Sequence, residues 1–185
     1  MKNLVAILLF VAVSTVLRAS SPLSYSVSNK WIIIDNEKWK SPSIDVTLRS
    51  IHGNTIFNEK ISRITKYNLK NVVEGEYTLV LEDNQKINSQ KVTIEKGKLI
   101  LTDESTIYKP HFIIHDMQIV DLNLMSQGAE VNIVIRDASG KDVFNETYKN
   151  QVSIEKRFNL SELPKGDYLI EVSHHGETFS QKVVR

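Results

Sequence analysis

The sequence contains one module twice, and this internal repeat limits the possible folds more than any other feature. Three strings recur in both copies: Asn-Leu, then Gly-Asp-Tyr or Gly-Glu-Tyr, then Ser-Gln-Lys-Val. They occupy 68–69, 75–77 and 89–92 in the first copy and 159–160, 166–168 and 180–183 in the second, at a constant offset of 91. Apolar and polar positions agree together, so we interpret the pattern as a duplication.

An upstream part of the repeat follows a slightly different offset. Gly53 and the string Phe57-Asn58-Glu59 match Gly140 and the string Phe144-Asn145-Glu146 at an offset of 87. The second copy therefore has four extra residues between these two parts, which we place near Tyr148 to Glu155.

Each copy alternates apolar and polar residues with the period of a strand that has one buried face. The alternating apolar residues are Ile44, Val46 and Leu48 in the first copy and Val131, Ile133, Ile135, Tyr168, Ile170 and Val172 in the second. Gly53 and Gly140 suit the left-handed position of a hairpin loop. Pro164 and Gly166 predict a sharp corner from Leu163 to Asp167. A tyrosine just after such a corner, as at Tyr168, resembles the tyrosine corner of immunoglobulin-like sandwiches.

These patterns predict an all-β protein made of two tandem immunoglobulin-like β-sandwich modules. No stretch has a sustained apolar repeat of 3.6 residues, so we expect little or no helix after the N-terminal segment. Residues 35–38 are expected to form a turn. We expect the modules to span residues 22–102 and 103–185, with a short junction at 103–109. The predicted core of the second module consists of Phe144 and the six alternating apolar residues given above for the second copy. Each module is small and lacks disulfides, so we expect its stability to depend on aromatic residues: Trp31, Phe57, Tyr77, Phe112, Phe144, Phe158 and Tyr168.

Residues 1–19 are predicted to be a secretory signal peptide. Lys2 gives a positive start, the stretch 4–13 is apolar throughout, and small residues precede a cleavage site that we place after Ala19. This apolar stretch is too short for a permanent membrane anchor. We therefore expect an exported chain, in the periplasm, at the cell surface or outside the cell.

Composition excludes several classes of function. The 23 basic and 22 acidic residues give no electrostatic reason to bind nucleic acid. Because the chain has no cysteine, it can have no disulfide, thiolate metal site or cysteine nucleophile. No glycine-rich phosphate loop is present.

The five histidines are the first candidates for metal or acid–base chemistry. His111 and His115 lie in a predicted strand, where four residues separate them by roughly 13 Å, too far to share one metal ion. His174 and His175 lie at a predicted hairpin tip, in the place of Asp83 and Asn84 in the first copy, and we expect them to face solvent. His52 lies in a loop.

The other motifs are weaker. The stretch 137–140 begins like a calcium loop but lacks the later ligands and the closing glutamate. Ser139 lacks the glycines of a nucleophile elbow. Asp103 and Glu104 are too close together to act as an acid and base pair. Trp31 and Trp39 could stack on a sugar ring, but a core role is the preferred reading. Asn145 and Asn159 begin glycosylation sequons, which matter only in a glycosylating host. We therefore predict no catalytic, cofactor-binding or metal-binding residue.

Two resemblances follow from the repeated strings. The segment from Asn159 through the corner 163–168 to the ending 181–185 resembles the C-terminal sorting domain of type IX secretion cargo in Bacteroidota. That resemblance implies a β-sandwich that is removed when the cargo is attached at the surface. The region upstream, however, is a second copy of the module where such cargo has a passenger enzyme. The whole chain resembles small exported tandem β-sandwich proteins of Bacteroidota of unassigned function.

The sequence thus predicts a non-catalytic exported binding or structural module, with envelope or surface proteins or the type IX machinery as candidate partners. A first alternative is type IX cargo whose second module is the sorting signal. We prefer a plain module because Ser-Gln-Lys-Val also occurs in the first copy. A second alternative is a metal-dependent hydrolase that uses His174 or His175. The sequence does not predict the oligomeric state.

Overall fold

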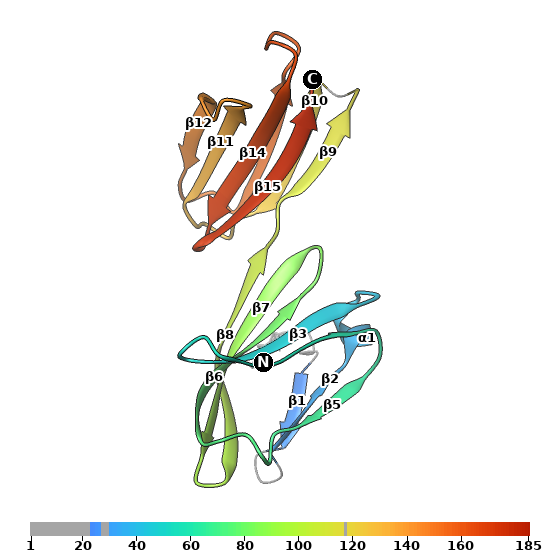
Figure 1. The fold of residues 1–185 in the computed structure, drawn as a ribbon, viewed down its shortest axis with the longest axis vertical. Coiled ribbons are helices and arrows are strands. Elements are labelled where there is room, and N and C mark those ends of the chain that lie inside the picture. The colour runs from blue at the N-terminus through green and yellow to red at the C-terminus, as the bar shows by residue number, and fades with distance from the viewer. Residues whose placement is uncertain (1–22, 27–29, 117) are drawn as a thin grey trace, which may run out of the picture.

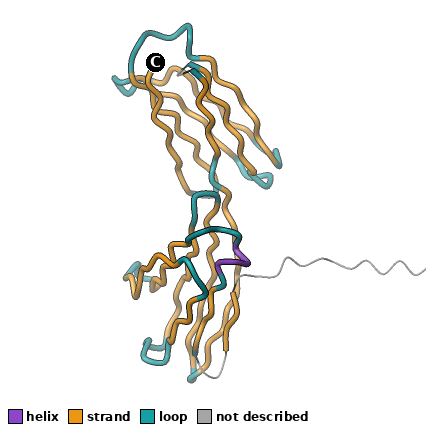
Figure 2. Tube along the Cα trace, turned by 90° about the vertical axis from the view of Figure 1, so that its right-hand side faces the viewer, coloured by secondary structure: helices purple, strands orange, loops and turns teal. Residues whose placement is uncertain are grey.

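The computed structural model of the chain describes residues 23–26, 30–116 and 118–185. It shows two β-sandwiches stacked along the long axis of the molecule and joined where β8 leads into β9 (Figure 1). The predicted signal peptide, residues 1–19, lies outside the described residues. The fold is all-β with immunoglobulin-like sandwiches in tandem, as the sequence predicts; the helix in Figure 2 is a single turn.

The first sandwich packs a three-stranded sheet, in the order β1-β2-β5, against a five-stranded sheet, in the order β4-β3-β6-β7-β8. Its elements are β1 (Leu23–Ser26), β2 (Trp31–Ile34), α1 (Asn36–Trp39), β3 (Ile44–Ser50), β4 (Thr55–Ile61), β5 (Thr65–Asn68), β6 (Gly75–Glu82), β7 (Lys86–Glu95) and β8 (Lys98–Tyr108).

The second sandwich packs a three-stranded sheet, in the order β13-β10-β9, against a four-stranded sheet, in the order β12-β11-β14-β15. Its strands are β9 (His111–His115), β10 (Ile119–Met125), β11 (Val131–Asp137), β12 (Asp142–Tyr148), β13 (Ser153–Asn159), β14 (Asp167–His174) and β15 (Glu177–Val184).

The two sandwiches repeat each other strand by strand. Both hairpins that open the larger sheet have a register shift at the equivalent point, Leu48/Arg49 in β3 and Ile135/Arg136 in β11. The loops of these hairpins use Gly53 and Gly140 at φ values of 82° and 83°, a conformation that glycine adopts at no steric cost.

The structure also extends the repeat to strands that the sequence comparison missed. Trp31 pairs with Asn68 as Ile119 pairs with Asn159, so β2 and β10 correspond. The Leu69 amide donates to the Lys30 carbonyl at 2.7 Å, and the equivalent Leu160 amide donates to the Gln118 carbonyl at 2.7 Å. By the same pairing, β1 corresponds to β9.

Each sandwich has its own hydrophobic core. The buried residues of the first core are Ile32, Ile34, Trp39, Ile44, Val46, Leu48, Ile61, Leu69, Tyr77, Leu79, Leu81, Val92, Ile94 and Leu99. Those of the second are Val120, Leu122, Leu124, Val131, Ile133, Ile135, Tyr148, Ile154, Phe158, Leu160, Tyr168, Ile170, Val172 and Val183. Among the residues that the structure describes, none belongs to both cores.

A tyrosine corner closes each core. The Tyr77 hydroxyl donates to the Val73 carbonyl at 2.7 Å, and the Tyr168 hydroxyl donates to the Pro164 carbonyl at 2.7 Å. Both rings are buried. The hydroxyl thus satisfies a backbone group at the corner while the ring fills the core, as the sequence predicts.

Four local expectations need correction. The predicted turn at 35–38 is the start of the one-turn helix α1, because the Asp35 carboxylate accepts from the Glu37 and Lys38 amides and caps it. Phe144 is only partly buried, since β12 lies at the sheet edge, although it packs against Phe158. Trp31 is also only partly buried.

The fourth correction concerns the segment 103–109, expected as the junction. Strand β8 runs unbroken through it as far as Tyr108, because residues 98–108 pair with β7 along their length apart from one register shift. The division into modules at 102/103 stays a prediction.

Candidate functional site

The strongest candidate site is the corner of the second module, where two separate parts of the sequence meet. We call it the corner site and define it as residues 163–167 and 182–185. Gly166 and Arg185 exchange backbone hydrogen bonds, with N···O distances of 3.1 and 2.9 Å. The Lys182 ammonium lies 2.7 Å from the Asp167 carboxylate across the β14–β15 pair. The guanidinium of Arg185 also donates to the Ser161 carbonyl.

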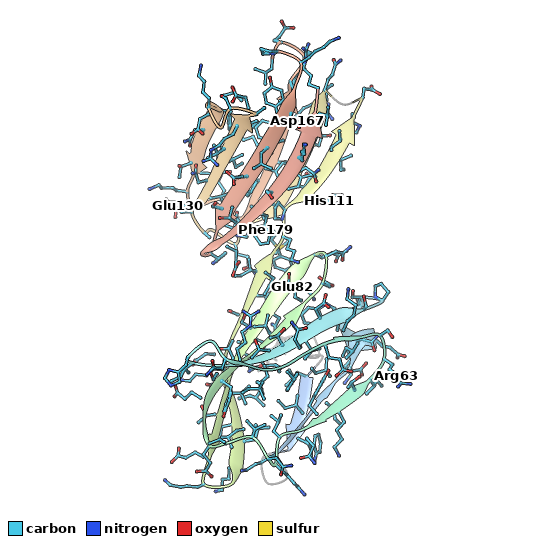
Figure 3. All side chains as sticks on the ribbon, in the orientation of Figure 1. Arg63, Glu82, His111, Glu130, Asp167 and Phe179 are labelled. Atoms are coloured by element: carbon cyan, nitrogen blue, oxygen red, sulfur yellow. The ribbon has the colours of Figure 1, made fainter. Side chains whose placement is uncertain are left out.

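This geometry follows directly from the local sequence. Leu163 donates its amide to the Leu160 carbonyl at 3.0 Å, so the chain turns immediately after β13 and enters β14 at Asp167. Antiparallel pairing then places Asp167 opposite Val184 and Tyr168 opposite Val183. The proline–glycine corner and the final lysine–arginine segment therefore form one continuous surface. Figure 3 shows Asp167 at the end of the second module that points away from the first.

A surface hollow adjoins the corner site. The loop between β11 and β12, residues 137–141, and the corner residues 164–168 line it together. The loop is held by Asp137, whose carboxylate accepts from the Ser139 amide and hydroxyl at 2.9 and 2.6 Å and from the Lys141 amide at 3.1 Å. These bonds, the Ser139 hydroxyl first, lower the pKa of Asp137. The Asp137 carboxylate thus stabilises the turn between β11 and β12.

His174 departs from its expected position. We expected a solvated hairpin tip, but the His174 side chain is buried, with 3% of the residue exposed, and only His175 is exposed. The ring lies 5.5 Å from the Phe179 ring and 5.4 Å from the His175 ring. Neither ring nitrogen has a hydrogen-bond partner among the described residues, although the Tyr108 backbone lies close enough to act on the ring's charge.

Burial lowers the pKa of His174, and the neighbouring His175 lowers it further; the Tyr108 backbone opposes both effects. The lowered pKa favours the neutral imidazole, which lies at the end of the second module that faces the first. Figure 3 places Phe179 at that end, with Glu82 below it on the first module. Lys109, which follows β8, is held to the first module: its amide donates to the Gln85 carbonyl at 2.7 Å and its ammonium lies 2.6 Å from Glu82.

The equivalent position in the first module carries a charge instead. Asp83 occupies the place of His174 and accepts from the Trp39 indole at 2.8 Å and from the Gln85 and Lys86 amides at 2.8 and 2.9 Å. Burial alone would raise the pKa of Asp83, but these donors lower it. Trp39 is consequently a core residue with a bonded indole, and Lys86 lies over its ring at 4.2 Å.

The other histidines lie apart from the corner site. His52 is exposed in a loop, and His111 and His115 are exposed on the edge strand β9. His115 lies 3.1 Å from Asp121, which also forms two short bonds with Arg157 at 2.6 and 2.7 Å. The Arg157 bonds, aided by His115, lower the pKa of Asp121 to about 2. Sequence reasoning missed this cluster because its members come from three strands.

Asp103 and Glu104 lie on β8 and interact with different residues. Glu104 and Thr106 accept from the Asn88 amide at 2.9 and 3.0 Å, while Asp103 acts electrostatically on Lys91. In the part of the chain that the structure describes, no three histidine or carboxylate side chains form a group that could hold a metal ion. Among the same residues, no helix is long and apolar enough to cross a membrane.

Comparison with solved structures gives distant similarities. A two-domain fibronectin type-III segment from chicken tenascin is 14% identical, with a TM-score of 0.33, and the match covers 89% of this chain and 98% of that one. The BSP domain of a biofilm associated protein is 13% identical, with a TM-score of 0.28, and the match covers 84% of this chain and 27% of that one.

Comparison with protein families gives a match within the second module. No curated protein matches the chain. Residues 116–185, which include the whole corner site and the strands β10 to β15, match the family model of the secretion system C-terminal sorting domain.

Proposed function

We propose that the second module is a type IX secretion sorting domain and that the first module is its non-catalytic cargo, acting as a binding or structural β-sandwich. This gives more weight to secretion than the sequence alone did. The observation that carries the proposal is the sorting-domain match over residues 116–185. It includes the corner site, where the two sequence segments that suggested a sorting domain lie hydrogen-bonded side by side.

The shared string Ser-Gln-Lys-Val argued for a plain module, and its structural role now weakens that argument. In both copies the lysine pairs with an acid on the neighbouring strand, Lys91 with Glu76 and Lys182 with Asp167. The valine is buried in both, as Val92 and Val183. These residues serve the fold in each copy, so their presence in the first copy does not count against sorting by the second.

What could distinguish the second copy is the exposed surface of its corner. The first copy has Val72, Val73 and Glu74 where the second has Leu163, Pro164 and Lys165. Glu74 accepts from the Gly97 amide at 2.8 Å, so the β7–β8 turn engages the first corner. The second corner instead meets Arg185. We propose that secretion components recognise this second corner.

Recognition of the second corner by secretion components would take the protein to the cell surface or into the medium. Because β8 ends at Tyr108 and β9 begins at His111, we propose to move the module boundary from the expected 102/103 to Lys109–Pro110. The metal-dependent hydrolase has less support, because zinc sites use three or four protein ligands and the described residues bring no third ligand to His174 and His175.

The test is export of a passenger. Residues 103–185 are fused behind a signal peptide and a fluorescent protein in a strain with a working type IX system. We expect the passenger at the surface, with the C-terminal part cleaved off, and retention in a strain that lacks the secretion system. Retention of the passenger in the periplasm of the working strain would contradict the proposal.

A further inference from the structure

Strand β15 forms an edge of the larger sheet in the second module. Among the described residues it pairs with β14 alone. Its counterpart in the first module, β7, is paired on both sides, with β6 and with β8. The same strand is therefore covered in one copy and open in the other.

The two strands present the same chemistry at their shared positions. Both contain Ser-Gln-Lys-Val, with the valine buried and the lysine paired to an acid on the preceding strand. Their exposure differs: the Lys91 side chain, next to the paired strand β8, is 40% exposed, whereas the Lys182 side chain is 63% exposed. Val184 at the end of β15 is 54% exposed, an apolar side chain left on the open edge.

In the first module, β8 pairs with the edge of β7 that corresponds to the open edge of β15. It therefore indicates what kind of strand β15 can accept. It runs antiparallel to β7 and places Leu101 opposite Val92 and Ile100 opposite Thr93. Thr102 lies opposite Lys91, and the acid Asp103 follows it. Glu76 is the main cause of the raised pKa of Lys91, and Asp103 adds to it. Strand β8 thus supplies apolar residues opposite Val92 and Thr93, followed closely along the chain by an acid.

We propose that β15 binds an extended segment of a partner polypeptide by antiparallel strand addition. The partner segment carries two adjacent apolar residues beside Val183 and Val184 and an acidic residue beside Lys182. Backbone hydrogen bonds supply much of the affinity in this mode of recognition, and side chains at alternate positions supply the specificity. This inference does not depend on the sorting function.

A second copy of the chain is a poorer occupant. Antiparallel pairing of β15 with a second copy of itself about Ser180 would set Lys182 beside Thr178, with no acid from the added strand, because residues that face each other in such a pair lie on the same face of the strand. Shifting this pairing so that Lys182 meets its own copy would place like charges together, which is unfavourable. An exposed lysine on an edge strand also disfavours pairing with strands that carry no acidic residue. The need for an acid beside Lys182 therefore limits which polypeptides can bind.

The experiment uses residues 20–185 and a labelled peptide with the sequence of residues 98–105, Lys-Leu-Ile-Leu-Thr-Asp-Glu-Ser. We expect saturable binding by fluorescence anisotropy at peptide concentrations up to about 1 mM. Amide hydrogen exchange should slow in β15, while β7, already covered, should not change.

Charge reversal provides the specificity test. Lys182→Glu should weaken binding of this peptide at least about tenfold, and a peptide with lysine in place of both acids should bind that variant better than it binds the unaltered chain. Lys91→Glu, the same change on the covered strand, is the matched control and should leave binding unchanged. Absence of saturable binding, slowed exchange in β7 instead of β15, or dimerisation of the chain through β15 would each overturn the proposal.

Discussion

The two modules show how one fold can be stabilised in two different ways at the same place. At the hairpin tip before the closing strand, the first module buries the Asp83 carboxylate and satisfies it with three hydrogen bonds, one of them from Trp39. The second module buries the His174 imidazole, whose ring nitrogens have no hydrogen-bond partner among the described residues. Residues that the two copies share therefore define the fold. Residues that differ, such as Asp83 and His174, determine how each copy stabilises this hairpin tip.

The copies also differ at the closing strand. The first copy covers β7 with β8, and the same strand leads into the second module. The second copy leaves β15 at a sheet edge. The covered copy is suited to a structural role, and the open copy is suited to recognition by another protein.

The largest expected effect concerns the tyrosine corners, where the two modules should behave alike. Tyr168→Ala removes a buried ring and should destabilise the second module by about 3–5 kcal/mol. Because the two cores share none of the described residues, the first module should keep its own unfolding transition. Tyr77→Ala should show the reverse pattern. Differential scanning calorimetry of both variants measures this, and a melting profile that Tyr168→Ala leaves unaltered would contradict the core assignment.

The next effect should break the symmetry between the modules. Trp39→Phe removes the indole donor to Asp83 while keeping an aromatic ring, and should destabilise the first module by about 1.5–3 kcal/mol, as expected for a hydrogen bond to a charged group. Chemical denaturation, followed by the fluorescence of the remaining Trp31 and by circular dichroism, reports the change. The Tyr168→Phe variant is a useful comparison, because it should lose only about 1 kcal/mol in the second module.

A pH dependence should occur in the second module through His174. Its pKa in the folded protein lies below the unfolded value, so the unfolded state binds more protons as the pH falls below about 6.5. Stability from this group is therefore complete above that pH and decreases as the pH falls towards the folded pKa, by at most about 1.4 kcal/mol per pH unit. Melting temperatures between pH 7.5 and 5 measure the loss.

Matched variants isolate the contribution of His174. His174→Gln should flatten this part of the pH profile, while His175→Gln, a change at the exposed neighbour, should keep most of it. An unaltered profile in His174→Gln would show that another group titrates.

The smallest expected effect should again be the same in both modules. Alanine at Gly53 or Gly140 would meet no atom within 4 Å, so only the left-handed backbone is unfavourable. Each change should destabilise its own module by about 1 kcal/mol. Unequal losses, measured by chemical denaturation, would mean that the two hairpins are less alike than their geometry indicates.

Much of the fold could be predicted from sequence because the repeat is written in residues with definite structural roles. Gly53 and Gly140 mark the hairpin loops, and Tyr77 and Tyr168 mark the corners. The correspondence of β2 with β10 was missed, because Trp31–Ile34 and residues 119–122 are mostly apolar but share no identical residue at equivalent positions. Residues 103–109, most of which belong to the end of β8, were taken for a junction, since the duplication offers no counterpart for comparison.

The site was harder to predict than the fold. The corner site joins Gly166 to Arg185 through strand pairing, which the repeated strings did suggest. Burial of His174 could not be predicted, because it arises where this hairpin tip meets the Tyr108 region of the chain, a contact between distant segments. Position in a hairpin tip predicts exposure only when nothing packs against the tip.

The most direct test of the central claim compares the two modules as export signals. The same signal peptide and fluorescent passenger are followed either by residues 103–185 or, as a control with the same fold, by residues 23–108. The measured quantity is the fraction of passenger at the cell surface in a strain with a working type IX system. The account predicts surface passenger with the second module and periplasmic passenger with the first. Equal surface fractions for the two fusions would contradict it.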